Sequence, residues 1–371
     1  MNRRMVLGGL VLGSAALAGG AFVRASVYRN SSSWTLTATE PDAAPSARPG
    51  MQYRTFGKTG MLLSEVGFGA LQIGQSYGTV HRSESLSALA RAEELGCNLI
   101  DTGGRYGDSE LVIGQFLNGR RSKWHVATKY SGQPEGLEAT IEQQLVRLGV
   151  DAIDFYQIHW APSRGENELY EALYRVKKAG KARFVGVSLY SVSDIDFVLK
   201  ETDIDGFQVA FSLLDPDPYL AKLDLIRKKG LGVLIRSSLK RGFLAGKFKR
   251  DATFPDPNDQ RHAWSRERIE AAVDAAEQFR FLEKDVGSMA VGAACYPLCF
   301  RETTSVLLGT KSERQADTNF GVVPGTRLSE ASLERIQQLQ RSMGLFQRKD
   351  RMIDLARQIL LVDLIRPILR R

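Results

Sequence analysis

Six short segments of this chain share one pattern: each is a run of mostly apolar, β-prone residues that ends in a polar or ionisable residue. The segments are Cys97 to Asp101, His125 to Lys129, Phe155 to His159, Phe184 to Ser188, Phe207 with Gln208, and Leu231 to Ser237. Their final residues lie 28, 30, 29, 20 and 29 positions apart. Because a strand, a helix and the joining loops need roughly 30 residues, this recurrence predicts successive βα units.

Two fold classes are built from such units, the (β/α)8 barrel and the doubly wound sheet. A barrel gathers the polar residues at the strand ends on one face, as the pattern requires. A doubly wound nucleotide-binding sheet would have a glycine-rich turn after its first strand, but the segment Val66 to Ala70 lacks the third glycine. The sequence therefore predicts an α/β protein with one (β/α)8 TIM barrel over residues 51–345.

Local turn signals add further elements. A polar glycine turn within Tyr53 to Met61 predicts a hairpin, which would plug the bottom of the barrel. The first barrel strand is expected near Val66 to Ala70 and the last near Val306 to Leu308. A helix is expected over Ser83 to Gly96, with Ser83 as its N-cap, and a final helix over Leu328 to Met343.

The first 25 residues are typical of an export signal. Arg3 and Arg4 are adjacent and precede an uncharged stretch, and Ala16 to Ala18 forms a small-residue cleavage site. The sequence predicts a protein exported by the twin-arginine route, either cleaved and periplasmic or anchored and facing the periplasm. A cytoplasmic location is the alternative. Residues 26–50 are expected to be a flexible linker.

The distribution of charge argues against a nucleic-acid partner. Of the net charge of +8, residues 1–50 carry +3 and residues 346–371 carry +4, which leaves +1 on the body of the chain. The three cysteines suggest no disulfide framework. The C-terminal segment 346–371 is predicted to be an apolar and basic helix whose apolar residues lie all around it. It is expected to pack on the barrel or a partner protein, with membrane contact as the lesser alternative.

One loop carries the most specific motif. Asp101-Thr102-Gly103 is followed by Tyr106-Gly107-Asp108-Ser109-Glu110. With Lys129 and His159, this loop resembles the aldo-keto reductase family, in which alanine usually stands at the position of Gly103. The resemblance runs from about residue 53 to residue 319 and includes segments 180–188, 242–247 and 309–312.

The resemblance implies that Tyr106 is the proton donor for a carbonyl substrate. Because a free phenol has a pKa near 10, it needs an ammonium beside it to stabilise the phenolate. Lys129 would supply that charge, Asp101 would hold Lys129, and His159 would orient the carbonyl. Taken singly, a histidine or an aspartate here could have only a structural role. Four reactive residues at consecutive strand ends favour a site.

The resemblance also implies NADPH or NADP as cofactor, extended across the top of the barrel, and it suggests no metal. Ser188 and Gln208 match the residues that hold the nicotinamide carboxamide, whereas Leu189 replaces the usual asparagine. The positions that match the pyrophosphate, ribose-phosphate and adenine contacts are Ser237, Leu239, Gly242, Gly309, Lys311, Ser312, Gln315 and Asn319, with Arg314 as a further cation.

A second departure is Arg236, which stands where the family usually has an aromatic residue stacked on the nicotinamide. A guanidinium can stack on a flat ring, but it would disfavour the positively charged oxidised cofactor. We therefore expect NADPH to bind more tightly than NADP+. The polar loop of residues 250–266 is expected to close over cofactor and substrate, with Trp264 and Tyr77 as candidate pocket residues.

Two functions remain open at this stage. The first is NADPH-dependent reduction of a small aldehyde or ketone to the alcohol. The second is a nucleotide-binding sensor or partner subunit with slow or no turnover, a role that the potassium-channel β subunits, which resemble the same family, illustrate.

Overall fold

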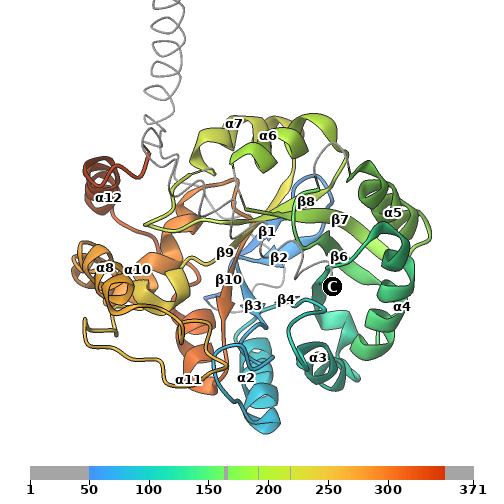
Figure 1. Ribbon diagram of the computed structural model, residues 1–371, viewed down its shortest axis with the longest axis horizontal. Helices are drawn as coiled ribbons and strands as arrows, with labels where there is room; N and C mark the ends of the chain where they lie inside the picture. The colour runs from blue at the N-terminus through green and yellow to red at the C-terminus, as the bar shows by residue number, and fades with distance from the viewer. Residues whose placement is uncertain (1–49, 163–165, 191, 218, 347–371) are drawn as a thin grey trace, which may run out of the picture. The chain divides into compact units, whose positions relative to one another are not determined.

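The computed structural model describes residues 50–162, 166–190, 192–217 and 219–346. Eight parallel strands form a closed barrel in the order β10-β3-β4-β5-β6-β7-β8-β9 (Figure 1). The strands are β3 (Val66–Gly69), β4 (Leu99–Asp101), β5 (His125–Tyr130), β6 (Ile153–Ile158), β7 (Ala182–Leu189), β8 (Gly206–Ala210), β9 (Gly232–Arg236) and β10 (Ser305–Gly309). Each of the six repeated segments overlaps one of these strands, so the predicted (β/α)8 barrel is confirmed.

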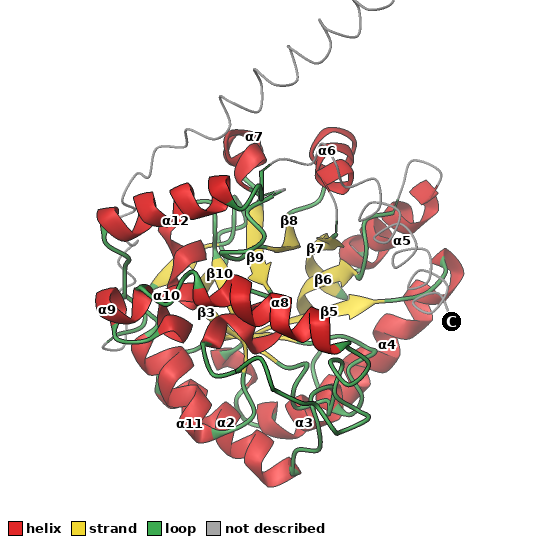
Figure 2. Ribbon diagram, turned by 60° about the vertical axis from the view of Figure 1, so that its left-hand side comes forward, coloured by secondary structure: helices red, strands yellow, loops and turns green. Residues whose placement is uncertain are grey.

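Helices surround the strands (Figure 2). They are α2 (Arg82–Glu94), α3 (Ser109–Leu117), α4 (Leu137–Leu148), α5 (Asn167–Lys178), α6 (Val192–Glu201), α7 (Leu223–Lys229), α8 (Arg266–Glu277), α9 (Leu282–Val286), α10 (Met289–Cys295), α11 (Glu313–Ala316) and α12 (Glu330–Ser342). The connection from β9 to β10 holds three of them, α8 to α10. None of the helices in the described part of the chain has the length and hydrophobicity that a bilayer crossing needs.

The predicted start of α2 was wrong by two residues. The N-cap is His81 and not Ser83, because His81 has the extended backbone (φ −68°, ψ 141°) of a cap and its N–H donates to the Glu84 carboxylate at 3.2 Å. Ser83 already lies within the first turn. The predicted stop is near Gly96, whose φ of +91° favours glycine.

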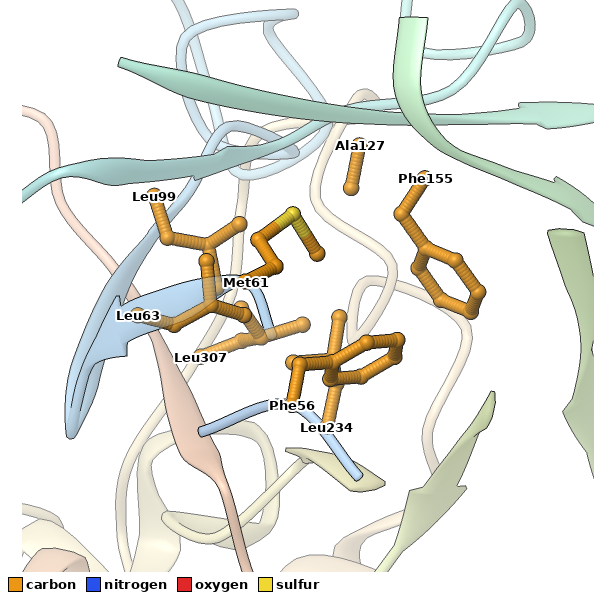
Figure 3. Packing of buried hydrophobic residues seen from close by; sticks show 8 residues of the cluster. All are labelled: Phe56, Met61, Leu63, Leu99, Ala127, Phe155, Leu234 and Leu307. Atoms are coloured by element: carbon orange, nitrogen blue, oxygen red, sulfur yellow. The ribbon is translucent and has the colours of Figure 1, made fainter. Parts of the chain in front are cut away.

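The hairpin of β1 (Tyr53–Thr55) and β2 (Leu62–Ser64) fills the end of the barrel at which the strands begin. Its side chains join those of the barrel strands in one buried cluster (Figure 3), which contains Phe56, Met61, Leu63, Leu99, Ala127, Phe155, Leu234 and Leu307. Gly206 and Gly232 open β8 and β9, and a Cβ atom on either would lie 2.3 Å from the Phe56 ring. The two glycines therefore make the space that Phe56 occupies.

Arg54 ties this hairpin to the chain that leads into the last strand. Its buried guanidinium donates to the carbonyls of Leu298 at 2.7 Å, Thr303 at 2.8 Å and Phe300 at 3.2 Å. It also lies 3.3 Å from the carboxylate of Glu65. The plug thus connects segments about 245 residues apart in sequence.

A polar layer replaces the apolar one toward the other end of the barrel. Side chains of a strand alternate between its two faces, so the inward row of β6 runs from Phe155 to Gln157 and on to His159. The buried members of this polar layer are Asp101, Lys129, Gln157, Ser188 and Gln208. The sequence predictions for residues 1–25, for the linker up to residue 49 and for residues 347–371 lie outside the described residues.

Candidate active site

An ion pair lies at the centre of the polar layer. Lys129 Nζ is 2.6 Å from Asp101 Oδ2 and also donates to the carbonyl of Thr102 at 2.6 Å. The other carboxylate oxygen, Asp101 Oδ1, accepts hydrogen bonds from the amides of Gln208 at 2.9 Å and Gln157 at 3.3 Å. The Lys129 side chain is 0% exposed and that of Asp101 is 6% exposed, so each charge depends on the other for its stabilisation.

Tyr106 and His159 lie beside this pair. Their ring centroids are 5.7 Å apart with an interplanar angle of 68°, and Lys129 Nζ is 5.1 Å from the centroid of the Tyr106 ring. A hydrogen bond of 3.1 Å joins His159 Nδ1 to the Ser131 hydroxyl and fixes the imidazole. The structure therefore brings together Tyr106, Lys129, Asp101 and His159, the four residues that the sequence singled out.

His159 is held in its neutral form. Burial lowers the pKa of its imidazole well below the usual 6.5, and the positive charges of Lys129, Arg236 and Arg105 lower it further. A neutral imidazole carries one N–H donor and one acceptor. It can therefore donate a hydrogen bond to a carbonyl oxygen at neutral pH without adding a charge to the site.

The pKa of Tyr106 differs from the sequence-based expectation. Burial raises it well above 10, and the negative charge of Asp101 raises it further, against a smaller opposing effect of Arg236. The expectation of a lowered pKa was wrong for the protein alone, because Asp101 offsets the charge of Lys129 at 2.6 Å and burial penalises the phenolate. Tyr106 consequently keeps its proton through the neutral range.

The second half of the motif is structural. Glu110 is buried and accepts hydrogen bonds from Thr128 and Gln144 at 2.7 Å each, and it forms an ion pair of 2.7 Å with Arg147. Ser109 shares a short hydrogen bond with the Thr102 hydroxyl. These contacts fix the start of α3, and with it the loop that carries Tyr106.

Ser188 and Gln208 lie side by side on β7 and β8. The Ser188 hydroxyl is fully buried and has no hydrogen-bond partner among the described residues. Leu189, which replaces the expected asparagine, has a buried side chain, and its carbonyl accepts from Arg236 Nη2 at 3.0 Å. An unused buried hydroxyl is costly unless a ligand satisfies it, so Ser188 marks a place where a polar ligand group fits.

The loop after β9 has unusual backbone geometry. Ser237, Lys240 and Arg241 have positive φ angles of 61°, 45° and 55°, and Gly242 follows at 90°. Non-glycine residues in this region are strained and are concentrated at functional sites. Lys240 Nζ lies 2.6 Å from both carboxylate oxygens of Asp215, and this ion pair braces the loop. Leu239 accepts the N–H of Gly242 at 2.8 Å.

The residues after β10 form a compact turn into α11. Ser312 is its N-cap and accepts the N–H of Gln315, whose side chain in turn accepts the N–H of Lys311 at 2.9 Å. Asn319 donates to the Thr310 hydroxyl at 2.9 Å and, at 3.4 Å, to the carbonyl of Gly309. In the protein alone, Gln315 and Asn319 therefore brace this loop. A pocket of ≈ 350 Å³ adjoins it, lined by Ser83, Glu84, Ser87, Ser312, Glu313 and Arg314.

A cluster of cations beside this loop was only partly predicted. Burial lowers the pKa of Lys247, and the charges of Arg261, Lys311 and Arg314 lower it further, so these three cations lie within electrostatic range of Lys247. Arg261 is itself paired with the Asp259 carboxylate at 2.6 Å. Sequence reasoning named Lys311 and Arg314 but gave Lys247 and Arg261 no role. Lys247 ends the segment 242–247 already noted for its resemblance, which is the signal that could have found it.

Residues 250–265 form a strap beside the loop after β9. Arg261 Nη1 donates to the carbonyl of Arg241 at 3.0 Å, and its guanidinium lies 5.2 Å from the Tyr77 ring and 4.1 Å from the Phe254 ring. Trp264 stacks on Phe243 at 5.4 Å with an interplanar angle of 3°. Arg261 thus joins the strap to the loops after β3 and β9. Of the two candidate pocket residues, Tyr77 contacts Arg261 and Trp264 contacts Phe243.

Two further residues escaped sequence reasoning. Gln157 donates a hydrogen bond to Asp101, and it lies on β6 two residues before His159, which directly follows the strand, so both side chains point to the same face. Trp160, directly after His159, has a buried indole N–H without a partner in the part of the chain that the structure describes. Within the same residues, no group of three or more histidine, cysteine, aspartate or glutamate side chains could hold a metal ion.

Comparison with known proteins gives related oxidoreductases. The chain is 30% identical over 301 residues to aldo-keto reductase str7 of Strobilurus tenacellus, covering 75% of this chain and 89% of the relative. It is 26% identical to aldo-keto reductase yakc [NADP(+)] of Schizosaccharomyces pombe, covering 74% and 87%. It is also 26% identical to the NADH-specific methylglyoxal reductase of Escherichia coli, covering 77% and 98%.

Solved structures show the same arrangement. The holo form of aldo-keto reductase AKR11C1 from Bacillus halodurans superposes with a TM-score of 0.64 at 25% identity, covering 78% of this chain and 96% of the other. The family model described as the aldo/keto reductase family matches residues 65–341, which include β3 to β10 and all four residues of the candidate site. The chain therefore belongs to the aldo/keto reductase family.

Proposed function

We propose that this protein reduces an aldehyde or ketone to the alcohol, with NADPH as hydride donor and Tyr106 as proton donor. The observation that carries the proposal is the convergence of Tyr106, His159 and the Lys129–Asp101 pair at the strand ends of one barrel. The family members named above are oxidoreductases, which supports the reaction class.

Each side chain has a distinct role in this proposal. When bound, the reduced nicotinamide supplies a hydride to the carbonyl carbon. Tyr106 gives its proton to the carbonyl oxygen, and the phenolate that remains is stabilised by Lys129. Asp101, fixed by Gln157 and Gln208, holds Lys129 in place. The neutral His159 orients the carbonyl by a hydrogen bond.

The residues present fit a nicotinamide dinucleotide that carries an extra phosphate. The buried and unpartnered Ser188 hydroxyl suits a carboxamide. Lys311 and Arg314 lie within electrostatic range of Lys247, where the resemblance puts the phosphates, whereas Arg261 in the same range is paired with Asp259. Cations of this kind bind phosphate oxygens by charge-assisted hydrogen bonds. The family relatives include an NADP-linked and an NADH-specific protein, and in this chain the cation cluster supports NADPH.

The form of the cofactor is a second part of the proposal. Arg236 lies 4.3 Å from the Tyr190 ring centroid and donates to the carbonyl of Leu189, which holds its positive charge near the end of β7. A fixed guanidinium beside the nicotinamide position disfavours an oxidised, positively charged ring. We therefore expect reduction to be the working direction. Equal affinities for NADPH and NADP+ in a titration would contradict this expectation.

The test of the main proposal is steady-state NADPH oxidation with a panel of small aldehydes and ketones. The wild-type protein should turn over part of the panel, and Tyr106→Phe should reduce kcat by about 100-fold or more while NADPH still binds. Tight NADPH binding with negligible turnover of every carbonyl would instead support the sensor or partner-subunit alternative.

Export is also a proposal, supported by Arg3 and Arg4 at the start of the chain. Fractionation of cells that express the full chain should find it outside the cytoplasm. Replacement of both arginines by lysine should retain it inside. Equal distribution of the two variants would contradict this route.

A further inference from the structure

The Ser131 hydroxyl lies within hydrogen-bond distance of the His159 imidazole. β5 and β6 are parallel and pair Tyr130 with Ile158, so Ser131 and His159 are the next positions in register. The N–H of His159 donates to the carbonyl of Tyr130 at 2.8 Å, which holds the two strand ends together. The Ser131 hydroxyl is then 3.1 Å from His159 Nδ1. This contact is therefore set by two neighbouring strands.

The loop that carries Ser131 is fixed by the residue in front of it. Tyr130 is buried, and its hydroxyl donates a short hydrogen bond to the carbonyl of Gln133. Gly132 and Gly136 lie against the same hydroxyl, and a Cβ atom on either glycine would come too close to it. The loop therefore wraps around the Tyr130 side chain, which gives Ser131 a defined position.

The two nitrogens of the His159 imidazole have different surroundings. Because burial and nearby positive charges lower its pKa, the ring is neutral at pH 7, with a hydrogen on one nitrogen and a bare acceptor at the other. Nδ1 has the Ser131 hydroxyl as its partner, whereas Nε2 has no hydrogen-bond partner among the described residues. Only the tautomer with its hydrogen on Nε2 leaves a donor for a ligand.

The two tautomers leave different numbers of polar groups without a partner. If Ser131 donates to Nδ1, only the Nε2–H lacks a partner within the part of the chain that the structure describes. If Nδ1–H donates to Ser131 instead, the serine hydrogen and the bare Nε2 both lack one there. A polar group without a partner is unfavourable in a buried site, and His159 is only 8% exposed. The tautomer with its hydrogen on Nε2 is therefore favoured.

The place of the imidazole hydrogen also matters for Tyr106. Its ring meets that of His159 edge to face, with centroids 5.7 Å apart. A bare Nε2 would be an acceptor that competes with a substrate carbonyl for the hydrogen of the Tyr106 hydroxyl. With the hydrogen on Nε2, both side chains offer a donor to the same carbonyl oxygen.

We propose that Ser131 is a positioning residue: its hydroxyl donates to His159 Nδ1 and so keeps the imidazole hydrogen on Nε2, where it donates to the substrate carbonyl. The inference rests on the proposed reduction, to which it adds the residue that selects the tautomer of His159. In a histidine, the hydrogen bond made by one nitrogen determines which nitrogen carries the hydrogen. Ser131 itself forms no bond to the substrate.

The test reads the tautomer by 15N NMR of the full chain labelled at histidine. The chain has four histidines, so there are few signals, and His159→Asn identifies those of His159. Protonated and bare imidazole nitrogens have well-separated 15N shifts. His262 provides an internal reference for a protonated Nδ1, because its Nδ1 lies 2.9 Å from the carbonyl of Phe254 and a carbonyl only accepts.

Three variants separate a positioning role from a purely structural one. Ser131→Ala removes the donor, Ser131→Thr keeps a hydroxyl, and Ser342→Ala is the control. Ser342 also donates its hydroxyl, to the carbonyl of Leu339 at 3.0 Å, but it ends α12 on the outside of the barrel. Each variant is compared with the wild type by its NMR spectrum and by kcat/KM for carbonyl reduction with NADPH.

In the wild type, His159 should carry its hydrogen on Nε2. In Ser131→Ala the Nδ1–H form should appear, and kcat/KM should fall by about 10-fold, the value of one hydrogen bond. Ser131→Thr should retain the Nε2–H form and most of the activity, and Ser342→Ala should change neither. A wild-type spectrum with the hydrogen on Nδ1 of His159 would overturn the inference, as would a Ser131→Ala protein with an unchanged tautomer or an unchanged kcat/KM.

The NMR reading requires no turnover, so it separates this inference from the proposed function. If no carbonyl compound is reduced but Ser131→Ala moves the hydrogen to Nδ1, the role of Ser131 in selecting the tautomer stands and the proposed reduction falls. If Ser131→Ala reduces the carbonyl compound as fast as the wild type does, the reduction stands and the role of Ser131 falls.

Discussion

The rings of Tyr106 and His159 meet edge to face, with centroids 5.7 Å apart, next to an ammonium that is already neutralised by Asp101. Both side chains are therefore uncharged in the neutral range, since burial raises the pKa of the phenol and lowers that of the imidazole. In the proposed reaction Tyr106 would therefore hold the transferable proton before hydride transfer, and the charge changes that the site must stabilise would arise only during that reaction.

The lowered pKa of His159 predicts a pH-dependent stability. Below the unfolded value of about 6.5 the unfolded chain binds a proton that the folded chain does not, so this histidine stabilises the fold above that pH and destabilises it progressively below. The free energy of unfolding of the wild type relative to His159→Asn should fall by up to about 1.4 kcal/mol per pH unit below pH 6.5. Urea unfolding at pH 5.0, 6.0 and 7.5 measures it. His262→Asn, at an exposed site, is the control; a pH-independent difference for His159→Asn would contradict the prediction.

The buried pair of Lys129 and Asp101 should be costly to break. Lys129→Met leaves a buried carboxylate that only amides contact, and the expected loss is about 3–5 kcal/mol of unfolding free energy together with loss of NADPH oxidation. Arg175→Gln breaks an ion pair with Glu138 whose side chains are 56% and 51% exposed, and it should cost less than about 1 kcal/mol. Similar losses for the two variants in urea unfolding would show that burial does not govern the Lys129 pair.

The fit of Phe56 against Gly232 predicts a coupled effect of two substitutions. Phe56→Ala should cost about 3–5 kcal/mol because it leaves a cavity in the plug. Gly232→Ala should also destabilise, since its Cβ would lie 2.3 Å from the Phe56 ring. In the double variant the cavity accommodates the new methyl group, so the combined loss should be smaller than the two single losses added together. Additive losses in urea unfolding would rule out the contact as the cause.

Lys311 is expected to discriminate between the two cofactors. Lys311→Gln should raise the Kd for NADPH by about 10-fold, the value of one charge-assisted hydrogen bond to the extra phosphate, and leave the Kd for NADH nearly unchanged. Fluorescence titration with each nucleotide gives both constants. Lys178→Gln, an exposed lysine at the end of α5, is the matched control. A parallel loss for both nucleotides would assign Lys311 a general structural role.

The barrel and the position of its four reactive residues could be predicted because both depend on local patterns. An apolar, β-prone run that ends in a polar residue identifies a strand in the sequence. Because the strands of the barrel are parallel, the residues at their ends lie on the same face. The electrostatics could not be predicted in this way. The pKa of Tyr106 depends on how far Asp101 neutralises Lys129 and on burial by distant segments.

The same limit applies to contacts that bridge separate loops. Arg261 contacts Arg241 and Tyr77, which are 20 and 184 residues away in sequence. Local sequence patterns do not indicate contacts between residues so far apart in the chain. The N-cap of α2 was missed because His81 caps through its backbone and Glu84, whereas sequence preference points to serine.

The grip of Arg54 on the carbonyls of Leu298, Phe300 and Thr303 has a consequence for synthesis of the chain. The hairpin that carries Arg54 is synthesised early, whereas the carbonyls that bind its guanidinium lie about 245 residues later in the chain. Until residues 298–309 have emerged, Arg54 lacks its carbonyl partners and the barrel lacks its last strand, so it cannot close. The protein therefore reaches its native fold only when its translation is nearly finished.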